Sequence, residues 1–595
     1  MELARLQYID PAKAQISEAL VRTFTQLAED AASVPRAELV CETMSVPPDA
    51  VLGQLSLPCF RFAKSLGMKP VDLASRLAEL LQQASLTWVD RIETKGPFLN
   101  FFYADKTLAE FLLTQSISGE DVKAVVRACE DPGRKTMVEY SQPNTHKEFH
   151  IGHVRGTCFG DAISRILAYV GYDVMPVNYF GDEGTHTAKC IWQLEKDQTR
   201  YTHKPQKDLA RWYNQYYVRA TQAFEAAEGQ VLDAYKAEVS AILKGIENKS
   251  GKYYDLWRQS RDECLADFKQ VYQWLGAKFD HDFTESEVSE ASQAIVDEYL
   301  EAGLFQQDQG AIGLSLEEHK LGFFMARKSD GSSLYITKDL ALARSKFADF
   351  NVAESIYVVG SEQTFHFQQL FKVLELMGFE QAQRCRHVPL AHVKLPEGKM
   401  SSRKGTAVSF ATLKSLVLEE VAGEMTKYRE EWSAEELEQT TYRLALGAIR
   451  YGMLSSEHEI VFDPKTWTSF EGNTGPYLMY SYSRASSMLR AECFKIAEVT
   501  VRWPEQLLSE EKLLLLHLYR FNQAARDAAE KYKPSVMAHY LFDLCKYFNR
   551  MYAHVPVRKE QDSALREMRL AIVALFRVYL ARGLDLLGIQ PVERM

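Results

Sequence analysis

The chain has 595 residues and a mass of 67.9 kDa, and 46% of its residues are hydrophobic and 25% charged. This is the composition of a globular protein; it excludes a disordered, fibrous or collagen-like chain, and the length allows about four domains of roughly 150 residues. The net charge of −10 argues weakly against a nucleic-acid partner, but the charged residues are unevenly distributed along the chain. Residues 464–595 hold 19 Lys and Arg against 14 Asp and Glu, whereas residues 1–463 hold 51 against 66. The basic last part indicates either a polyanionic partner or an uneven surface without function.

No segment has the pattern of a secretory signal or a membrane span. The N-terminus MELARLQYID lacks a basic stretch followed by an apolar one, and no run of 18 apolar residues occurs; even the apolar C-terminal stretch is interrupted by Arg577 and Arg582. The nine cysteines are scattered, without CxxC pairs or zinc-ligand spacing. We therefore expect a cytoplasmic protein with reduced thiols, no membrane association and no bound metal.

In chain order, the predicted elements begin with a small α+β unit over residues 1–108 that ends in the strand-like GPFLNFFYA. A charged connector follows at 129–135. The next segments are predicted to be a strand (TMVEYS), a turn, a helix (GDAISRILAYVGY) and a second strand (DVMPVNYF). This order is a βαβ unit, which implies a parallel sheet. Residues 191–275 are helical and charged, as in an insertion. Strand and helix then alternate again through SLYITKDLALARSKF and ESIYVVGSEQTFHFQQLFKVLELMGF, and nearly everything after residue 412 is predicted to be helical.

The first motif with chemical potential is His150-Ile151-Gly152-His153, which follows a strand and a turn and opens a helix. Gly152 has no Cβ, so a nucleotide can approach the backbone, and the helix N-terminus offers N–H groups to phosphates. The two imidazoles can donate hydrogen bonds to phosphate oxygens whose charge grows during displacement, and Lys147 adds a cation nearby. The alternatives are a metal-binding pair or a helix-capping histidine; a metal is disfavoured because no further ligand lies at suitable spacing.

A second motif follows the turn LPEG and has the composition that a phosphate clamp requires. It is cationic, rich in serine and bounded by glycine, and it consists of Lys399, Met400, Ser401, Ser402, Arg403, Lys404 and Gly405. Most basic loops are merely solvated, so the segment alone is weak evidence. The segment follows an α/β region that begins with the first motif, whose one-letter sequence is HIGH, and this position strengthens the functional interpretation.

HIGH followed by a KMSKS-like loop resembles the class I aminoacyl-tRNA synthetases. The segments that resemble arginyl-tRNA synthetases occur in order along nearly the whole chain: GPFLNFFYA, SQPNTHKEFHIGH, SLYITKDLALA, YVVGSEQTFHFQQLFKVLELMGF, KLPEGKMSSRKG, FEGNTGPYLMYSYSRA and GLDLLGIQPVERM. The resemblance implies an α/β fold with a Rossmann-type parallel-sheet catalytic domain. The implied organisation is an N-terminal tRNA-binding α+β domain (1–108), the catalytic domain (134–411) with a helical insertion (about 191–275), a helical linking segment (412–462) and a C-terminal all-α anticodon-binding domain (463–595).

The resemblance further implies the activity of an arginine–tRNA ligase. ATP with Mg²⁺ would activate L-arginine to arginyl-adenylate, and the arginyl group would pass to the 3′ end of tRNA(Arg), with no prosthetic group. We expect a monomer that binds tRNA and not DNA. The family's catalytic positions fall on Lys147, His150, His153 and Lys399. ATP would be bound by these four residues together with Gly152, Met400, Ser401, Ser402, Arg403 and Lys404.

The family's arginine-binding positions fall on Asn144, Glu285, Tyr335, Asp339 and Gln363. A guanidinium is a planar cation with five donors, so carboxylates and planar acceptors suit it. Each residue has an ordinary alternative: Asn144 could serve a Pro-Asn turn, Asp339 could be an acid in a first helical turn, and Tyr335 could be core. We expect Tyr335 and Asp339 to lie around a strand-to-helix turn, where Thr337 would act as a cap.

The chain departs from the family pattern at two places. Ser402 stands where KMSKS has its second lysine, and Lys147 upstream of HIGH is a candidate replacement, so the cation that neutralises pyrophosphate is left open. In NYFGDEGTHTAKC, Glu183 and His186 stand where the common form has Trp and Gln. Three alternatives remain: another class I specificity, a different nucleotidyl transferase with the HIGH fold, and a non-enzymatic tRNA-binding paralogue, which should lose HIGH or clamp residues.

Overall fold

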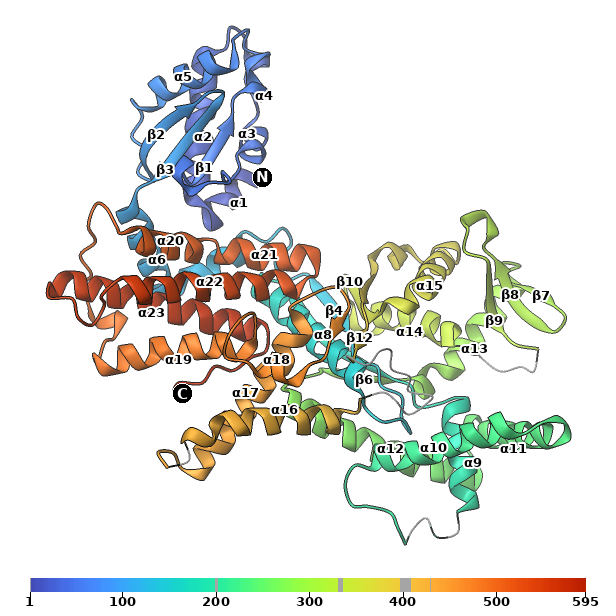
Figure 1. Cartoon of the computed structure of the whole chain (residues 1–595). Coiled ribbons are helices and arrows are strands. Elements are labelled where there is room, and N and C mark those ends of the chain that lie inside the picture. Colours follow the sequence, from blue (N-terminus) through green and yellow to red (C-terminus); the bar gives the residue numbers. More distant parts are fainter. Residues whose placement is uncertain (1, 198, 200–201, 330–334, 396–407, 429) are drawn as a thin grey trace.

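The computed structural model of the chain describes residues 2–197, 199, 202–329, 335–395, 408–428 and 430–595. At its centre lies a five-stranded sheet in the order β11-β10-β4-β5-β6 (Figure 1). All four strand pairs are parallel, which confirms the parallel sheet expected from the sequence. The strands are β4 (Lys135–Glu139), β5 (Asp173–Phe180), β6 (His281–Thr284), β10 (Glu354–Gly360) and β11 (Cys385–Leu390).

The strand order places a switch point beside β4. The chain runs outward from β4 to β5 and β6 on one side, and later from β10 to β11 on the other. In such sheets the connections leave in opposite directions at the switch point, and a crevice opens at the carboxyl ends of the strands. Helix α8 (Ile151–Tyr169) connects β4 to β5. It can lie close to the sheet because Gly160 has no side chain; a Cβ at this position would come within 2.1 Å of the Tyr140 ring.

Between β5 and β6 the chain forms the insertion expected from the sequence, as four helices. These are α9 (Thr185–Lys196), α10 (Leu209–Ala226), α11 (Gly229–Glu247) and α12 (Gly251–Leu275). Three further helices flank the later strands: α13 (Glu285–Glu301), α14 (Tyr335–Phe350) and α15 (Thr364–Leu376). Figure 1 shows the insertion helices as a separate arm beyond β6.

The expectation of a strand-to-helix turn at Tyr335 is wrong in two respects. Tyr335 is the first residue of α14, and the preceding strand, β9 (Phe323–Arg327), belongs to a separate antiparallel sheet with β7 (Gln306–Asp308) and β8 (Ala311–Ser315). Thr337 lies inside the first turn, and its hydroxyl donates to the carbonyl of Ala326 at 2.5 Å instead of capping the helix. The sequence pattern does not predict this small sheet, because its strands are only three to five residues long.

The N-terminal part is a three-stranded antiparallel sheet, in the order β1-β3-β2, packed on helices. Its elements are α1 (Glu2–Ile9), α2 (Pro11–Leu27), α3 (Ala37–Thr43), β1 (Leu55–Pro58), α4 (Phe60–Ala63), α5 (Pro70–Leu81), β2 (Val89–Lys95) and β3 (Phe98–Tyr103). It stands above the C-terminal helices in Figure 1. The two parts are joined by polar contacts: the Tyr519 hydroxyl donates to Asp10 at 2.8 Å, and the Lys512 ammonium lies 2.5 Å from the Asp105 carboxylate.

The rest of the chain is almost entirely helical, as the sequence predicts. Helices α6 (Asp105–Ser118) and α7 (Glu120–Arg127) lead into β4, and the short strands β12 (Val393–Lys394) and β13 (Ile460–Val461) pair in parallel. The C-terminal helices are α16 (Phe410–Met425), α17 (Ala434–Leu454), α18 (Pro464–Thr468), α19 (Gly475–Ala491), α20 (Ser509–Tyr519), α21 (Phe521–Lys531), α22 (Pro534–His554) and α23 (Ser563–Leu586).

A single buried side chain, Arg450 of α17, ties three parts of the molecule together. Its guanidinium donates to the carbonyl of Leu587 at 2.8 Å and to that of Leu275 at 2.7 Å, and it pairs with Asp161 of α8. The C-terminal helices, the end of the insertion and the helix behind HIGH therefore meet at one cation.

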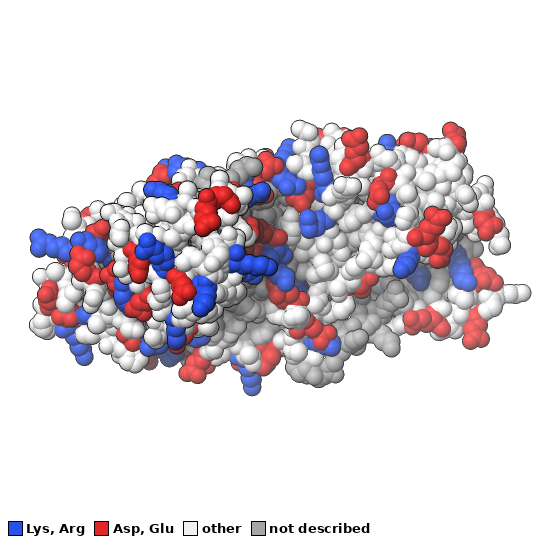
Figure 2. All heavy atoms as spheres, turned by 90° about the horizontal axis from the view of Figure 1, so that it is seen from above, with Lys and Arg blue, Asp and Glu red and all other residues white. Residues whose placement is uncertain are grey.

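The face of the molecule seen in Figure 2 does not show the charge division of the sequence. On the face shown in Figure 2, Lys and Arg side chains alternate with Asp and Glu instead of forming one basic stripe. Among the described residues, no helix is both long and apolar enough to cross a membrane.

Candidate active site

The N-terminus of α8 is built around the two histidines of HIGH. His150 is the N-cap residue, and its Nδ1 accepts the backbone N–H of Gly152 at 3.1 Å. The backbone N–H of His150 in turn donates to Nδ1 of His153 at 3.3 Å, which makes a reciprocal capping box. The two rings stack with their centroids 3.8 Å apart and an angle of 19° between their planes. Helix capping, one alternative to a functional role, is therefore present, and it fixes the position of both rings.

Burial determines the protonation state of both rings, and the capping bonds determine which nitrogen carries the proton. Burial, followed by the nearby Lys147 ammonium, lowers the pKa of His150 to about 4. Burial, followed by the charge of His150, holds the pKa of His153 well below its ordinary value. Both rings are therefore neutral at pH 7, and because each Nδ1 is an acceptor, each ring carries its proton on Nε2. The helix N-terminus thus offers two uncharged Nε2–H donors.

The backbone around Gly152 is open to a ligand. Gly152 is exposed, and a Cβ at this position would come within 3.0 Å of the His150 ring, so a side chain would displace the imidazole. Exposed N–H groups and the positive end of the helix dipole are suited to phosphate oxygens. The ammonium of Lys147 lies 5.3 Å from the centre of the Tyr217 ring and is near enough to both histidines to lower their pKa.

The predicted clamp lies wholly outside the described residues, which include none of Lys399, Met400, Ser401, Ser402, Arg403, Lys404 and Gly405. Its downstream flank, however, is hydrogen-bonded to HIGH. The N–H of Ile151 donates to the carbonyl of Val408 at 2.9 Å, and the N–H of Phe410 donates to the carbonyl of Phe149 at 2.8 Å. His150 and Ser409 form an isolated antiparallel bridge. The segment that follows the clamp, some 250 residues after HIGH in the chain, therefore lies at the N-terminus of α8.

Asn144 and Glu285 converge on Gly181, at the carboxyl end of β5. Asn144 forms an isolated parallel bridge with Gly181. An ideal Cβ at Gly181 would lie 2.3 Å from Oδ1 of Asn144 and 3.3 Å from Oε1 of Glu285. Only glycine allows the amide and the carboxylate to approach so closely. Burial, opposed by the Lys338 ammonium and assisted by the carboxylates of Asp182 and Asp339, raises the pKa of Glu285 to about 8.

Two of the three remaining predicted arginine ligands lie near this pair. The Tyr335 hydroxyl is 3.4 Å from the ideal Cβ position of Gly184, which has a φ of +108°. Tyr335 as a whole is 53% exposed, but its hydroxyl lies against the protein at Gly184, and the loss of water there, then the Glu285 carboxylate, raises its pKa to about 12, so the phenol is neutral. Asp339 accepts a hydrogen bond from His366 at 2.6 Å, and its charge is felt at Glu285. Gln363 lies in the exposed turn directly after β10, and no contact to the other four is recorded among the described residues.

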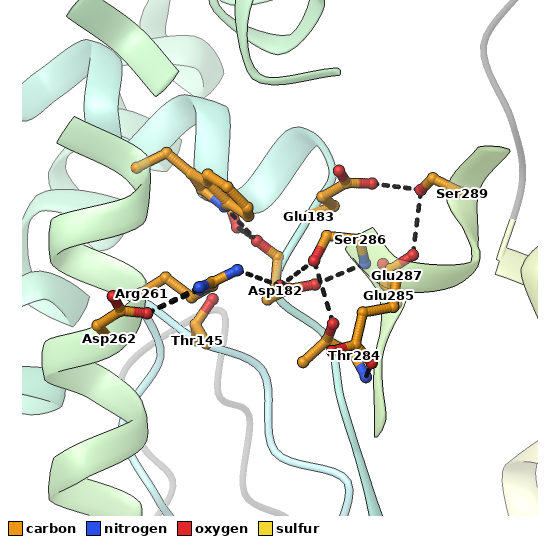
Figure 3. A network of polar contacts seen from close by, with 12 residues as sticks. Thr145, Asp182, Glu183, Arg261, Asp262, Thr284, Glu285, Ser286, Glu287 and Ser289 are labelled. Atoms are coloured by element: carbon orange, nitrogen blue, oxygen red, sulfur yellow. Dashed lines mark hydrogen bonds and ion pairs between the residues drawn. The ribbon is translucent and has the colours of Figure 1, made fainter. Parts of the chain in front are cut away.

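The carboxylate that departs from the family pattern, Glu183, is buried with 4% of its surface exposed. It accepts a hydrogen bond from the Ser289 hydroxyl at 2.5 Å (Figure 3). The Lys338 ammonium lies 2.9 Å from the same oxygen. The ammonium is also 3.4 Å from Oε2 of Glu285. Sequence reasoning missed Lys338; the available signal was its place three residues after Tyr335, on the same face of α14.

Asp182 and His186 are the neighbours of Glu183 in the segment after β5, and both are buried. Asp182 is fully buried and accepts hydrogen bonds from the N–H and the hydroxyl of Ser286, at 2.9 and 2.6 Å, with Arg261 at 3.6 Å (Figure 3). Burial raises its pKa to about 6. His186 is 6% exposed, and its Nδ1 has no hydrogen-bond partner among the residues that the structure describes. Burial holds the pKa of His186 well below its ordinary value, so this ring is neutral.

Comparison with known protein families covers almost the whole chain. Residues 115–463 match the model of the tRNA synthetases class I (R), catalytic domain. Residues 11–103 match the arginyl tRNA synthetase N terminal domain, and residues 478–595 match the DALR anticodon binding domain. The chain belongs to the arginyl-tRNA synthetase family.

Curated relatives of this arginyl-tRNA synthetase agree over its length. It is 39% identical over 553 residues to the arginine–tRNA ligase of Bdellovibrio bacteriovorus, which covers 92% of this chain and 93% of the relative. It is 33% identical over 566 residues to the arginine–tRNA ligase of Clostridium acetobutylicum, covering 94% and 97%. The resemblance stated from the motifs is confirmed, and the chain is an arginine–tRNA ligase with a class I catalytic domain.

Solved structures show that the arrangement of the parts is that of the same fold. The arginyl-tRNA synthetase of Thermus thermophilus superposes with a TM-score of 0.76 at 24% identity, covering 98% of this chain and 99% of that one. The enzyme of Plasmodium falciparum superposes with a TM-score of 0.74 at 18% identity, covering 99% of both chains. The predicted α/β fold with a Rossmann-type catalytic domain and a helical C-terminal part is thereby confirmed.

Proposed function

We propose that this arginyl-tRNA synthetase activates L-arginine at the carboxyl ends of β4 and β5 and transfers it to tRNA(Arg). ATP and arginine would bind side by side, with the triphosphate against the N-terminus of α8 and the arginine against Gly181. The observation that carries the proposal is the pair of neutral, stacked imidazoles of His150 and His153, which present two Nε2–H donors at the N-terminus of α8.

On the ATP side, Lys147, His150, Gly152 and His153 would hold the triphosphate. Their chemistry suits phosphate oxygens: two N–H donors, an open helix N-terminus and one ammonium. Lys399, Met400, Ser401, Ser402, Arg403 and Lys404 would close over the same phosphates; Val408, which follows them, is hydrogen-bonded to Ile151. We assign Lys399 and Lys147 as the cations that neutralise the departing pyrophosphate, in place of the lysine that Ser402 replaces.

Magnesium would enter with the ATP phosphates. The residues that face them are cations and N–H donors, which complement the phosphates and not a second cation. Among the described residues, no group of three or more His, Cys, Asp and Glu has the arrangement of a metal site. The ion would supply charge neutralisation of the triphosphate, while the protein positions the nucleotide.

On the arginine side, five residues would recognise the amino acid: Asn144, Glu285, Tyr335, Asp339 and Gln363. Glu285 provides a buried carboxylate for the guanidinium, and such charge-assisted pairs are the strong hydrogen bonds of protein interiors. The neutral Tyr335 phenol adds a planar wall with one hydroxyl. Asn144, in the loop between β4 and HIGH and six residues before His150, would hold the α-carboxylate where it can meet the α-phosphorus.

The chemistry then requires little beyond positioning. The carboxylate of arginine attacks the α-phosphorus in line, and pyrophosphate leaves with the bonding electron pair. The Nε2–H donors of His150 and His153 stabilise the charge that grows on the phosphate oxygens. The ribose 2′-hydroxyl at the 3′ end of tRNA then attacks the adenylate carbonyl and AMP leaves. Holding both reactants in one crevice replaces a costly bimolecular encounter.

The remaining parts would bind the tRNA. We assign residues 1–108 to contacts with the tRNA corner, 134–411 to catalysis with the insertion at about 191–275, 412–462 to a link, and 463–595 to the anticodon. The excess of 19 Lys and Arg over 14 Asp and Glu after residue 463 supports phosphate contacts there. We further propose a cytoplasmic monomer that serves translation and does not bind DNA.

Arginine-dependent exchange of pyrophosphate into ATP, measured with and without tRNA(Arg), tests the proposal. We expect exchange with L-arginine alone among the twenty amino acids, and efficient exchange only with tRNA present, because tRNA binding completes the site. Exchange with another amino acid, or none with arginine and tRNA together, would contradict it.

A further inference from the structure

The carboxylate of Glu183 belongs to a buried cluster of three charges beside Gly181. Glu183 is 4% exposed, Glu285 is 5% exposed and Lys338 is 8% exposed. The Lys338 ammonium lies 2.9 Å from Glu183 and 3.4 Å from Glu285. Ser289 of α13 contacts the cluster, because its hydroxyl donates to Glu183 at 2.5 Å and its oxygen lies 3.1 Å from the backbone carbonyl oxygen of Glu285 (Figure 3).

The cluster has two carboxylates for one ammonium, so its formal charge is −1 when both acids are ionised. A bound arginine side chain, with a charge of +1, would bring the total to zero. If residue 183 carried no charge, Lys338 and Glu285 would already cancel within the cluster, and of the proposed ligands only Asp339, which already accepts a hydrogen bond from His366 at 2.6 Å, would be left to compensate the guanidinium. Uncompensated buried charge is costly. The charge that the cluster offers to arginine therefore depends on Glu183.

The two oxygens of Glu285 serve different neighbours. Oε2 faces the Lys338 ammonium, at 3.4 Å. Oε1 lies on the other side, 3.3 Å from the ideal Cβ position of Gly181, next to the amide of Asn144. One oxygen is thus held by the protein, and the other faces the proposed arginine site.

We propose that Glu183 is a positioning residue for arginine recognition: it binds the Lys338 ammonium and thereby leaves the charge of Glu285 to the substrate guanidinium. The proposal rests on the assignment of Glu285 as an arginine ligand. The closer contact of Lys338 is with Glu183, as this role requires. Without Glu183, Lys338 has a single carboxylate partner and competes with arginine for it.

Ionisation of Glu285 supplies the diagnostic readout. The charged and titratable groups that face it are Asp182 and Glu183 after β5, Tyr179 of β5, and Tyr335, Lys338 and Asp339 of α14. The pKa of Glu285 is about 8, raised chiefly by burial, so arginine affinity in the wild type should improve as the pH rises through 8. When Lys338 turns fully to Glu285, as expected in Glu183→Gln, the pKa of Glu285 falls, and the improvement moves to lower pH.

The experiment compares Glu183→Gln with the wild type in tRNA-stimulated pyrophosphate exchange between pH 6.5 and 9.5. We expect the KM for arginine at pH 9 to rise about tenfold, since the coupling of a buried charge pair is commonly worth that much or more. The kcat should stay within about threefold, because the phosphate-binding residues are untouched. Glu290→Gln changes an exposed acid of α13, the helix that carries Glu285, removes the same charge and should leave both constants unchanged.

The double variant Glu183→Gln/Lys338→Gln separates this role from a merely structural one. It removes the competing ammonium together with its partner and restores a charge of −1 on Glu285 alone. We expect it to recover most of the KM increase at pH 9. A KM for Glu183→Gln within twofold of the wild type, or a double variant no better than the single one, overturns the proposal. Loss of all arginine-dependent exchange in the wild type would instead refute the proposed function itself.

Discussion

Substitution of His153 separates the two roles that the structure gives to its ring. Nδ1 of His153 accepts the N–H of His150 and so helps to cap α8, while the proton on Nε2 is available to a phosphate oxygen. His153→Ala removes both functions. His153→Asn keeps an acceptor near the position of Nδ1 and removes the distal donor.

The magnitudes follow from these two contacts. Loss of one preorganised donor to a developing oxyanion costs about 2.7–4 kcal/mol of transition-state stabilisation, or about 10²–10³ in rate. Loss of a capping hydrogen bond costs about 1 kcal/mol of stability. We therefore expect both variants to lose about 10²–10³ in the rate of adenylate formation, and only His153→Ala to be measurably less stable.

Arginine-dependent pyrophosphate exchange at saturating substrates measures the first effect, and thermal melting followed by circular dichroism measures the second. The pKa of His150 is about 4 and that of His153 lies well below its ordinary value, so the protonation of these rings should not change the exchange rate between pH 6 and 8. The reasoning is refuted if His153→Asn retains more than about a tenth of the wild-type rate.

Three further predictions concern groups that the fold buries. Burial raises the pKa of Glu285 from its ordinary 4.5 to about 8, so the stability that the protonated group contributes is fully present below pH 4.5 and is lost as the pH rises through 8. Glu285→Gln should therefore raise the melting temperature of the arginine-free enzyme at pH 9 but not at pH 5, and should abolish arginine activation; an equal shift at both pH values would contradict the assignment. Arg450→Met leaves the buried Asp161 with only the partly exposed Arg165 and leaves two carbonyls without their donor, at a cost of about 3–5 kcal/mol. Adding Asp161→Asn should recover part of the resulting loss of melting temperature, and no recovery would show that the ion pair is not the cause. Gly160→Ala places a Cβ 2.1 Å from the Tyr140 ring and should cost about 1–3 kcal/mol by displacing α8 from β4, whereas Gly423→Ala, where nothing lies within 4 Å, should be neutral or stabilising in the same melting assay.

Much of the molecule could be predicted from the sequence because the relevant patterns are local. The runs that form β4, β5 and β10, and the helical pattern of α8, are short-range signals, and together they specify a parallel sheet with HIGH at a helix N-terminus. The motifs in their order were enough to identify the family. The start of α14 at Tyr335 and the small β7–β9 sheet were missed, since three- to five-residue strands carry too little pattern to be recognised.

The electrostatics of the site were decided only by the tertiary structure. Glu183 and Lys338 are 155 positions apart, and Asp161 and Arg450 are 289 apart, yet each pair is buried and in contact. The strength and the partner of a charge depend on distance and burial, which have no signature in a linear pattern. For the same reason, HIGH could be recognised in the sequence, but the neutral state of its rings and the nitrogen that carries each proton followed only from the folded helix cap.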